Sequence, residues 1–110
     1  MDLFTKAFWL IALHFVADFH LQSDFVAKNK LPGSVAIWPW VMTAHAALHG
    51  AMVGAILGPV FGIAEFAAHW LIDHAKGRGW LGEGQGGFIL DQSLHLGLKA
   101  VWLGLFYAIA

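Results

Sequence analysis

Four long apolar segments make up most of this chain, and they constrain its fold more than any other feature. The segments run from about residue 3 to 21, 38 to 57, 60 to 75 and 88 to 110. A bilayer core about 30 Å thick requires about 20 helical residues, because an α-helix rises about 1.5 Å per residue. The segments are close to this length, although the third is slightly short. The sequence therefore predicts four transmembrane helices.

The composition supports this prediction. Hydrophobic residues account for 59% of the 110 residues and charged residues for only 12%. A soluble domain of this size needs a polar shell, for which too few polar side chains are present. The alternative is a soluble bundle of four core helices, but no segment has a broad charged face. We expect an all-α, polytopic membrane protein: a single four-transmembrane-helix bundle over residues 1–110, with the lipid bilayer as its partner.

Several classes of site and partner are excluded by the same composition. The net charge is −1 and the chain has no basic patch, so we expect no nucleic-acid partner. The absence of cysteine rules out disulfides, thiolate metal sites and iron–sulfur clusters. The first segment is a poor signal peptide, because His14 and Asp18 lie inside it and no small-residue cleavage site follows it.

The connections between the segments predict how the chain is oriented. A polar linker covers residues 22–34, Gly58-Pro59 separates the second and third segments, and a glycine-rich loop covers residues 76–87. The linker and the loop lie on the same side, because two crossings separate them. Most basic residues lie in these two connections: Lys28, Lys30, Lys76 and Arg78. The positive-inside rule therefore predicts a cytoplasmic linker and loop, with both termini on the opposite side of the membrane.

Each apolar segment also contains a pair of ionisable residues four positions apart. This spacing places both side chains on one helix face, one turn apart. Ionisable groups inside a membrane are costly and usually mark functional sites. One such histidine alone would most often be a hydrogen-bonded core residue, but four pairs are hard to explain in that way. The pairs are His14 and Asp18, His45 and His49, His69 and Asp73, and Asp91 and His95.

The four pairs are expected at one level of the membrane, near the cytoplasmic leaflet. They occur late in the two segments that run toward the cytoplasm and early in the two that run away from it. Imidazole and carboxylate ligands suit a divalent transition metal, zinc first, with manganese, iron or nickel as further candidates. Eight ligands are enough for two metal ions, and four-helix bundles often hold such centres between facing helices.

Two alternatives to a metal centre stay open. Haem held between two histidines would explain the imidazoles, but it would not require the aspartates. A metal-free network, in which histidines and aspartates hydrogen-bond one another or conduct protons, would explain both residue types. Gln22, Asp24 and Gln92 lie beside the site and could orient ligands or bind substrate, and Asp24 is the candidate catalytic base.

Two further charged residues predict an ion pair away from the site. Glu65 lies eight residues before Asp73, and Lys99 lies eight residues after Asp91. The third and fourth segments run in opposite directions, so both charges should lie about 12 Å deeper in the bundle than the site. We therefore expect an intramembrane ion pair between Glu65 and Lys99. His20 and His74 fall at helix ends, where we expect them to be solvated.

The most specific run of the sequence is HFVADFHLQSD from His14, followed by AKNK up to Lys30. Together with the later His and Asp pairs, it resembles the bacterial and phage membrane proteins grouped as domain of unknown function 3307. The resemblance covers most of the chain and implies a multi-pass protein of the bacterial inner membrane, or a phage-encoded one inserted in the host membrane. It implies no reaction. The pattern is also loosely similar to small membrane proteins labelled metal-dependent hydrolases.

Three functions are compatible with these residues. The first is a metal-dependent membrane hydrolase that acts on a lipid or headgroup-level substrate; no Gly-x-Ser-x-Gly nucleophile motif is present. The second is transport of metal ions or protons, which would require polar groups across the whole membrane. The third is a structural subunit stapled by metal or by a polar core. Small residues allow close helix contacts within or between chains, so a homo-oligomer is also considered: Gly50, Gly54, Gly58, Gly97 and Gly104.

Overall fold

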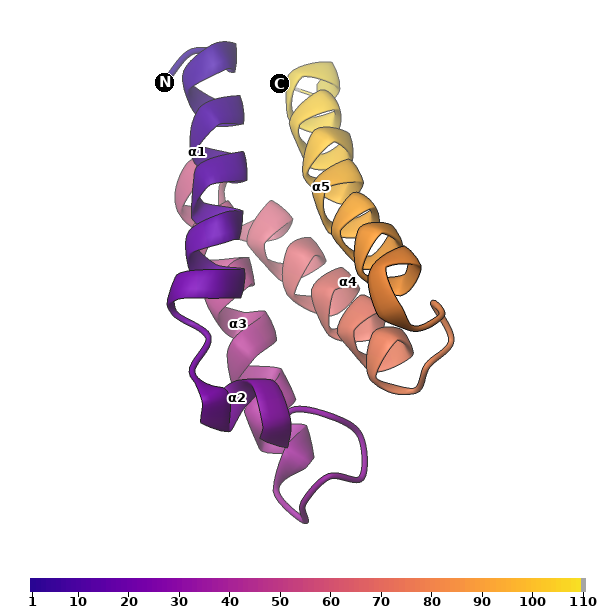
Figure 1. Ribbon diagram of the computed structural model, residues 1–110. Coiled ribbons are helices and arrows are strands. Elements are labelled where there is room, and N and C mark those ends of the chain that lie inside the picture. Colours follow the sequence, from indigo (N-terminus) through magenta and orange to yellow (C-terminus); the bar gives the residue numbers. More distant parts are fainter. Residues whose placement is uncertain (110) are drawn as a thin grey trace.

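The computed structural model describes residues 1–109, and throughout that range the regular structure is helical (Figure 1). The expected all-α fold is thus confirmed. The elements in chain order are α1 (Leu3–Phe15), the π-helical segment η1 (Val16–His20), α2 (Asp24–Asn29), α3 (Trp38–Leu57), α4 (Pro59–Gly77) and α5 (Gly84–Ile109). Both termini and the α3–α4 turn lie at one end of the molecule, whereas α2 and the connections 30–37 and 78–83 lie at the other (Figure 1).

The helix boundaries agree closely with the sequence prediction for α3 and for the first segment, which α1 and η1 together fill, and they differ for α4 and α5. α4 is longer than the predicted segment 60–75, and α5 begins at Gly84 within the predicted glycine-rich loop. The predicted linker, residues 22–34, contains a short helix, α2, that the sequence did not predict. The hydroxyl of Ser23 caps this short helix by accepting a hydrogen bond from the Val26 backbone N–H.

The turn between α3 and α4 depends on glycine and proline. Gly58 adopts a φ of 103°, which side-chain-bearing residues rarely reach, and so ends α3. Pro59 then occupies the first turn of α4, where its missing N–H costs no intrahelical hydrogen bond. A Cβ on Gly62 would lie 2.7 Å from the Gly50 carbonyl oxygen, so these glycines allow α3 and α4 to pack closely.

The interior of the bundle is more polar than its surface. Among residues 1–109, buried polar or charged side chains outnumber buried hydrophobic ones. The small apolar core of Leu10, Val53 and Leu57 lies toward the end of the termini. Large hydrophobic side chains are exposed instead, as at Phe4 (81% exposed) and Val60 (76%). This distribution is the reverse of that in a soluble domain, which exposes only limited apolar patches.

One helix in the described part of the chain, α3, is long and apolar enough by length and composition to cross a membrane. The core helix of a soluble protein meets the same criteria. The other three predicted spans stay a prediction.

Candidate metal centre

The eight predicted ligand residues come together between the helices. Each is at most 9% exposed, although they are drawn from five different elements. α1 contributes His14, η1 contributes Asp18, α3 contributes His45 and His49, α4 contributes His69 and Asp73, and α5 contributes Asp91 and His95. The i, i+4 spacing explains this convergence, because it turns one face of each helix toward the same central region.

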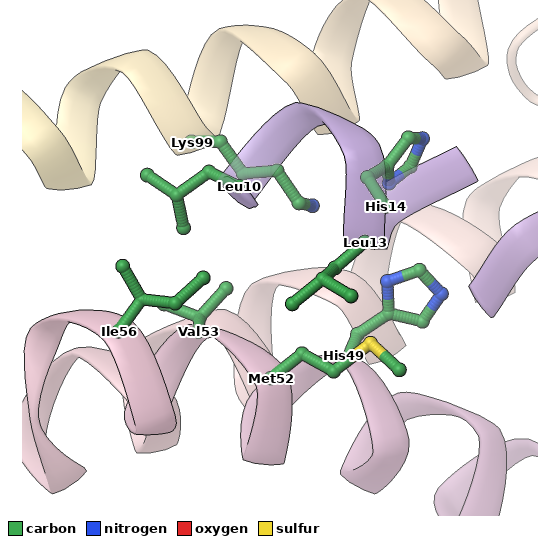
Figure 2. Close-up of a pocket in the computed structure, with 8 residues that line it drawn as sticks. All are labelled: Leu10, Leu13, His14, His49, Met52, Val53, Ile56 and Lys99. Atoms are coloured by element: carbon green, nitrogen blue, oxygen red, sulfur yellow. The ribbon is translucent and has the colours of Figure 1, made fainter. Parts of the chain in front are cut away.

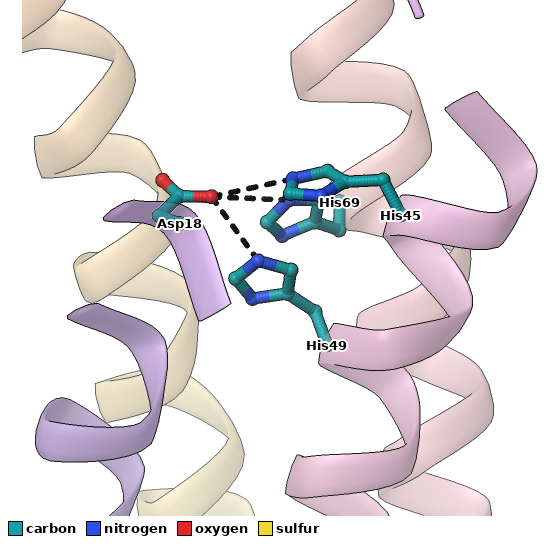
Figure 3. A group of neighbouring side chains, drawn as sticks. All are labelled: Asp18, His45, His49 and His69. Carbon is teal, nitrogen blue, oxygen red and sulfur yellow. Dashed lines mark ion pairs between the residues drawn. The ribbon is translucent and has the colours of Figure 1, made fainter. Parts of the chain in front are cut away.

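A first group of potential ligands surrounds Asp18, whose Oδ1 atom faces three imidazoles (Figure 3). This oxygen lies 3.3 Å from His45 Nε2, 3.1 Å from His49 Nε2 and 4.0 Å from His69 Nε2. The four potential ligand atoms all lie within 4.8 Å of one another. The rings of His49 and His69 are stacked with centroids 3.7 Å apart, which helps to hold them in this orientation.

The unpartnered nitrogens of this group fit a metal site better than a hydrogen-bonded cluster. The Nε2 atoms of His45, His49 and His69 are all buried and have no hydrogen-bond partner. Buried polar atoms in proteins are normally partnered, so three such atoms at one point require an explanation. Zinc–nitrogen bonds of about 2.0–2.1 Å in a tetrahedral site separate neighbouring ligand atoms by about 3.3 Å. The donor set therefore fits a divalent transition metal.

A second group consists of Asp73, Asp91 and His95. His95 Nε2 lies 3.0 Å from Asp73 Oδ1 and 3.3 Å from Asp91 Oδ1. The other oxygen of Asp73 lies 3.5 Å from His45 Nε2 and 3.4 Å from His69 Nε2, in the first group. Asp73 therefore occupies the position of a carboxylate that could bridge two metal ions.

The π-helical segment η1 was not predicted, and it contains Asp18. In this wider turn, the Leu21 backbone N–H donates to the carbonyl oxygen of Val16, five residues earlier, instead of to the residue four positions earlier as in an α-helix. Such π-turns occur frequently at functional sites. The sequence carries no clear signal for this segment, because the i, i+4 pair of His14 and Asp18 suits an ordinary α-helix equally well.

His14 differs from the other predicted ligands, because it belongs to neither group. Its Nε2 lies 2.9 Å from Gln92 Oε1. An amide oxygen only accepts hydrogen bonds, so His14 Nε2 donates here. Gln92 in turn donates to Asp18 Oδ2 at 2.9 Å and to Asp91 Oδ2 at 3.3 Å. His14 and Gln92 are thus placed to orient the carboxylates, and the expectation that Gln92 lies beside the site is confirmed.

The predicted ion pair between Glu65 and Lys99 is confirmed. Lys99 Nζ donates to Glu65 Oε1 at 2.8 Å, and both residues are almost completely buried. The same oxygen lies 3.4 Å from His69 Nδ1, and Trp102 Nε1 donates to Glu65 Oε2 at 2.7 Å. Carboxylates commonly hold the second nitrogen of metal-bound histidines in this way. Glu65, His69 and His95 also satisfy the spacing of a metal group, but Lys99 and Trp102 already engage both Glu65 oxygens.

Lys30 reaches the site although the sequence pattern did not single it out as a site residue. Lys30 lies at the C-terminal end of α2, and its Nζ donates a hydrogen bond to Asp73 Oδ2 at a distance of 3.2 Å. Asp24, the predicted base, lies exposed in the first turn of α2 and forms no ion pair with the described cluster. His20 is exposed as expected, whereas His74 is partly buried and stacks on Trp70.

The two groups of potential ligands are closed off at the end of the bundle that holds the termini. They are open at the end that holds the connections 30–37 and 78–83. Figure 2 shows His14 and His49 at one side of a narrow pocket whose remaining lining is mostly apolar, including Leu10, Val53 and Ile56. On the opposite side of the cluster, a cavity of about 180 Å³ reaches the carboxylates. Its polar lining comprises Asp18, Gln22, Lys30, Asp73, Lys76, Asp91 and Gln92.

Comparison with known proteins identifies the family of the chain. A family model described as "Protein of unknown function (DUF3307)" matches residues 7–108. No curated protein and no solved structure matches the chain. The match covers nearly the whole chain, including both ligand groups and the Glu65–Lys99 pair, and agrees with the resemblance of the His14–Lys30 run. The chain therefore belongs to the DUF3307 family of proteins of unknown function.

Proposed function

We propose that this protein spans the bacterial inner membrane four times, through α1–η1, α3, α4 and α5. The exposed apolar side chains and the polar interior support this arrangement, because lipid favours the first and penalises the exposure of the second. α1, with 13 residues, continues directly into η1, with 5 residues. α4 contains 19 residues and α5 contains 26. Each helix therefore has at least the roughly 17 residues with which a helix can cross a bilayer. The basic connections would then be cytoplasmic and the termini periplasmic.

Within this bundle, the His and Asp groups bind one or two divalent transition-metal ions, zinc first. The observation that carries the proposal is the convergence of three buried, unpartnered Nε2 atoms on Asp18 Oδ1. Asp18, His45, His49 and His69 would hold one ion, and Asp73, Asp91 and His95 a second. Haem is a poorer fit, because the His69 ring stacks on the rings of His49 and His95 at centroid distances of 3.7 and 4.0 Å, which leaves no room for a macrocycle between them.

The activity that this site supports best is metal-dependent hydrolysis of a lipid or headgroup-level substrate. A bound metal ion would supply Lewis-acid polarisation of an ester or phosphoryl oxygen and a more acidic water. The cavity gives a substrate access to the carboxylates from the end of the bundle that would be cytoplasmic in the proposed topology. Asp91 lines this cavity, and its buried Oδ1 has no hydrogen-bond partner. If only the first group holds an ion, Asp91 is better placed than Asp24 to accept a proton.

Transport of metal ions or protons is supported less well. Beyond Lys99, the next buried cation is Lys6, which donates to the Tyr107 hydroxyl at 3.2 Å near the other end of the bundle. The apolar core around Leu10 and Val53 lies between these two positions. An ion crossing this layer would lose its polar partners, so the layer favours a site that is reached from one side only.

The test is hydrolysis by purified protein before and after metal removal. Wild-type protein in mixed micelles should hydrolyse a phosphate or carboxylic ester lipid, lose this activity on chelation, and regain it with zinc or manganese. His49→Ala should be inactive even after reloading, whereas His20→Ala, which alters an exposed histidine, should match wild type. Full activity in metal-stripped protein would refute the proposal.

A further inference from the structure

The cavity of about 180 Å³ beside the two groups of potential ligands has an unusual balance of charged side chains. Three carboxylates line it, from Asp18, Asp73 and Asp91, together with two ammonium groups, from Lys30 and Lys76. With neutral histidines, the lining therefore carries one net negative charge. A single divalent cation in either group would reverse this sign, and a second would make it strongly positive. A substrate that enters a metal-loaded site should accordingly be an anion.

The two lysines are placed where such an anion would need them. Lys30 Nζ lies 3.2 Å from Asp73 Oδ2, so its charge is held directly at the level of the metal groups. Lys76 lines the same cavity from the last turn of α4, one helical turn beyond Asp73. Ammonium groups bind phosphate oxygens as flexible point charges and do not demand planar geometry. The pair therefore suits a phosphate more specifically than a neutral ester.

The remaining lining of the cavity is apolar and continues onto the outer surface. Phe19 and Phe88 both line it, and their ring centroids are 6.1 Å apart. Phe15 continues this row along α1, with its ring centroid 6.1 Å from that of Phe19. All three phenylalanines are exposed, at 41–49%. A molecule bound in the cavity would thus have charged groups on one side and an open hydrocarbon-like surface on the other.

We propose that the cavity binds a lipid phosphate, with its phosphate between Lys30 and Lys76 and its hydrocarbon chain along Phe19 and Phe88. This proposal rests on the proposed function and specifies its substrate class. A water-soluble phosphate ester would use the lysines but gain nothing from the phenylalanines. A neutral lipid would do the opposite. The juxtaposition of both surfaces in one cavity favours a molecule that carries both parts.

The proposal is tested by binding of hexadecylphosphonate, which has a phosphonate group, a long chain and no hydrolysable ester. Metal-loaded protein in dodecyl maltoside is titrated with it, and the thermal unfolding midpoint is recorded. Hexadecanol and methylphosphonate serve as probes that lack the anion and the chain, respectively. The midpoint should rise saturably with hexadecylphosphonate. It should be unchanged with hexadecanol and should respond to methylphosphonate only at far higher concentration.

Variants locate the binding site. Lys30→Gln and Lys76→Gln should each weaken hexadecylphosphonate binding about tenfold, since each removes one charge-assisted hydrogen bond. Lys30→Arg should retain most of the affinity, because it keeps the positive charge, and the unfolding midpoint of Lys30→Gln without ligand checks that this variant is folded. Lys28→Gln is the matched control, because Lys28 is exposed on α2 outside the cavity lining. Undiminished binding to the Lys30→Gln/Lys76→Gln double variant would overturn the proposal.

The metal content of each sample separates this proposal from the proposed function. If wild-type protein holds metal but does not bind hexadecylphosphonate, the lipid-phosphate proposal is wrong while the metal centre stands. Equal binding of methylphosphonate would overturn the lipid part and indicate a water-soluble phosphate ester. If wild-type protein takes up no metal even after equilibration with zinc, yet binds hexadecylphosphonate through Lys30 and Lys76, the lipid-phosphate site is supported and the metal-dependent function is refuted. Absence of both metal and hexadecylphosphonate binding refutes both.

Discussion

The carboxylate of Glu65 lies 2.8 Å from the ammonium group of Lys99, and the two side chains are 0% and 3% exposed between α4 and α5. A buried ion pair of this kind contributes little net stability, but a single partner left alone is costly. Here the pair also contacts His69, one of the candidate metal ligands, through the 3.4 Å approach of Glu65 Oε1 to Nδ1. If His69 binds metal as proposed, stability and metal binding would therefore be linked at this point.

Removal of one member of the pair should destabilise the protein more than removal of both. We expect Lys99→Met to lower the free energy of unfolding by about 3–5 kcal/mol, because it leaves the Glu65 carboxylate buried without its cation. The double variant Glu65→Gln/Lys99→Met should recover much of this loss. Unfolding in a mixed-micelle denaturant titration measures both values. If the destabilisation of the double variant equals the sum of those of the single variants Glu65→Gln and Lys99→Met, the two side chains are not coupled.

The same double variant provides a test of the role of Glu65 toward His69. Its fold should be retained, but His69 Nδ1 would face a neutral amide instead of a carboxylate. We expect zinc affinity to fall about 10–100-fold, as is usual when the residue supporting a metal-bound histidine is changed. Competition with a chromophoric zinc chelator measures the affinity. Unchanged affinity in a folded double variant would limit Glu65 to pairing with Lys99.

Because α3 and α4 pack closely, replacing glycine by alanine should lower the stability of the protein at Gly62 but not at Gly97. Gly62→Ala should destabilise the protein by about 1–3 kcal/mol, because the new Cβ would lie 2.7 Å from the Gly50 carbonyl oxygen. Gly97→Ala is the matched control on α5, where a Cβ has no neighbour within 4 Å. It should be neutral or stabilise the helix by up to about 1 kcal/mol. Equal unfolding midpoints for the two variants would contradict the packing.

The proposed topology can be tested with single cysteines, because the chain has none of its own. Ser34 and Ile109 are both exposed and lie at opposite ends of the bundle. In intact cells, a membrane-impermeant maleimide should label Ile109→Cys but not Ser34→Cys, which should react only after the inner membrane is permeabilised. Labelling of both cysteines from the same side would contradict the proposed spans.

Much of the candidate site could be predicted because its determinants are local. The i, i+4 spacing of His69 and Asp73 turns both side chains to one face, and antiparallel helices bring the four pairs to one level. The same reasoning placed Glu65 opposite Lys99. These predictions need only helical periodicity and alternating helix direction, which the apolar segments indicate directly.

Other features depend on tertiary contacts that no local pattern encodes. Lys30 meets Asp73 because the connection after α2 folds over the end of α4, where Pro32 packs against Gly77. The exclusion of His14 from both ligand groups depends on small helix rotations and on the hydrogen bond to Gln92. The π-turn around Asp18 likewise has no distinct sequence signal. For this reason the sequence predicted eight equivalent ligands, whereas the structure divides seven of them between two groups and leaves His14 outside both.

The central claim is that the buried His and Asp groups bind divalent metal, and elemental analysis of protein equilibrated with zinc and freed of excess tests it most directly. We expect about one or two zinc ions per chain in wild-type protein and in the exposed-histidine control His20→Ala. His45→Ala and His69→Ala should lose most of this zinc while keeping their helical circular dichroism. Wild-type protein without bound zinc, manganese, iron or nickel, or equal zinc content in all four proteins, would contradict the account.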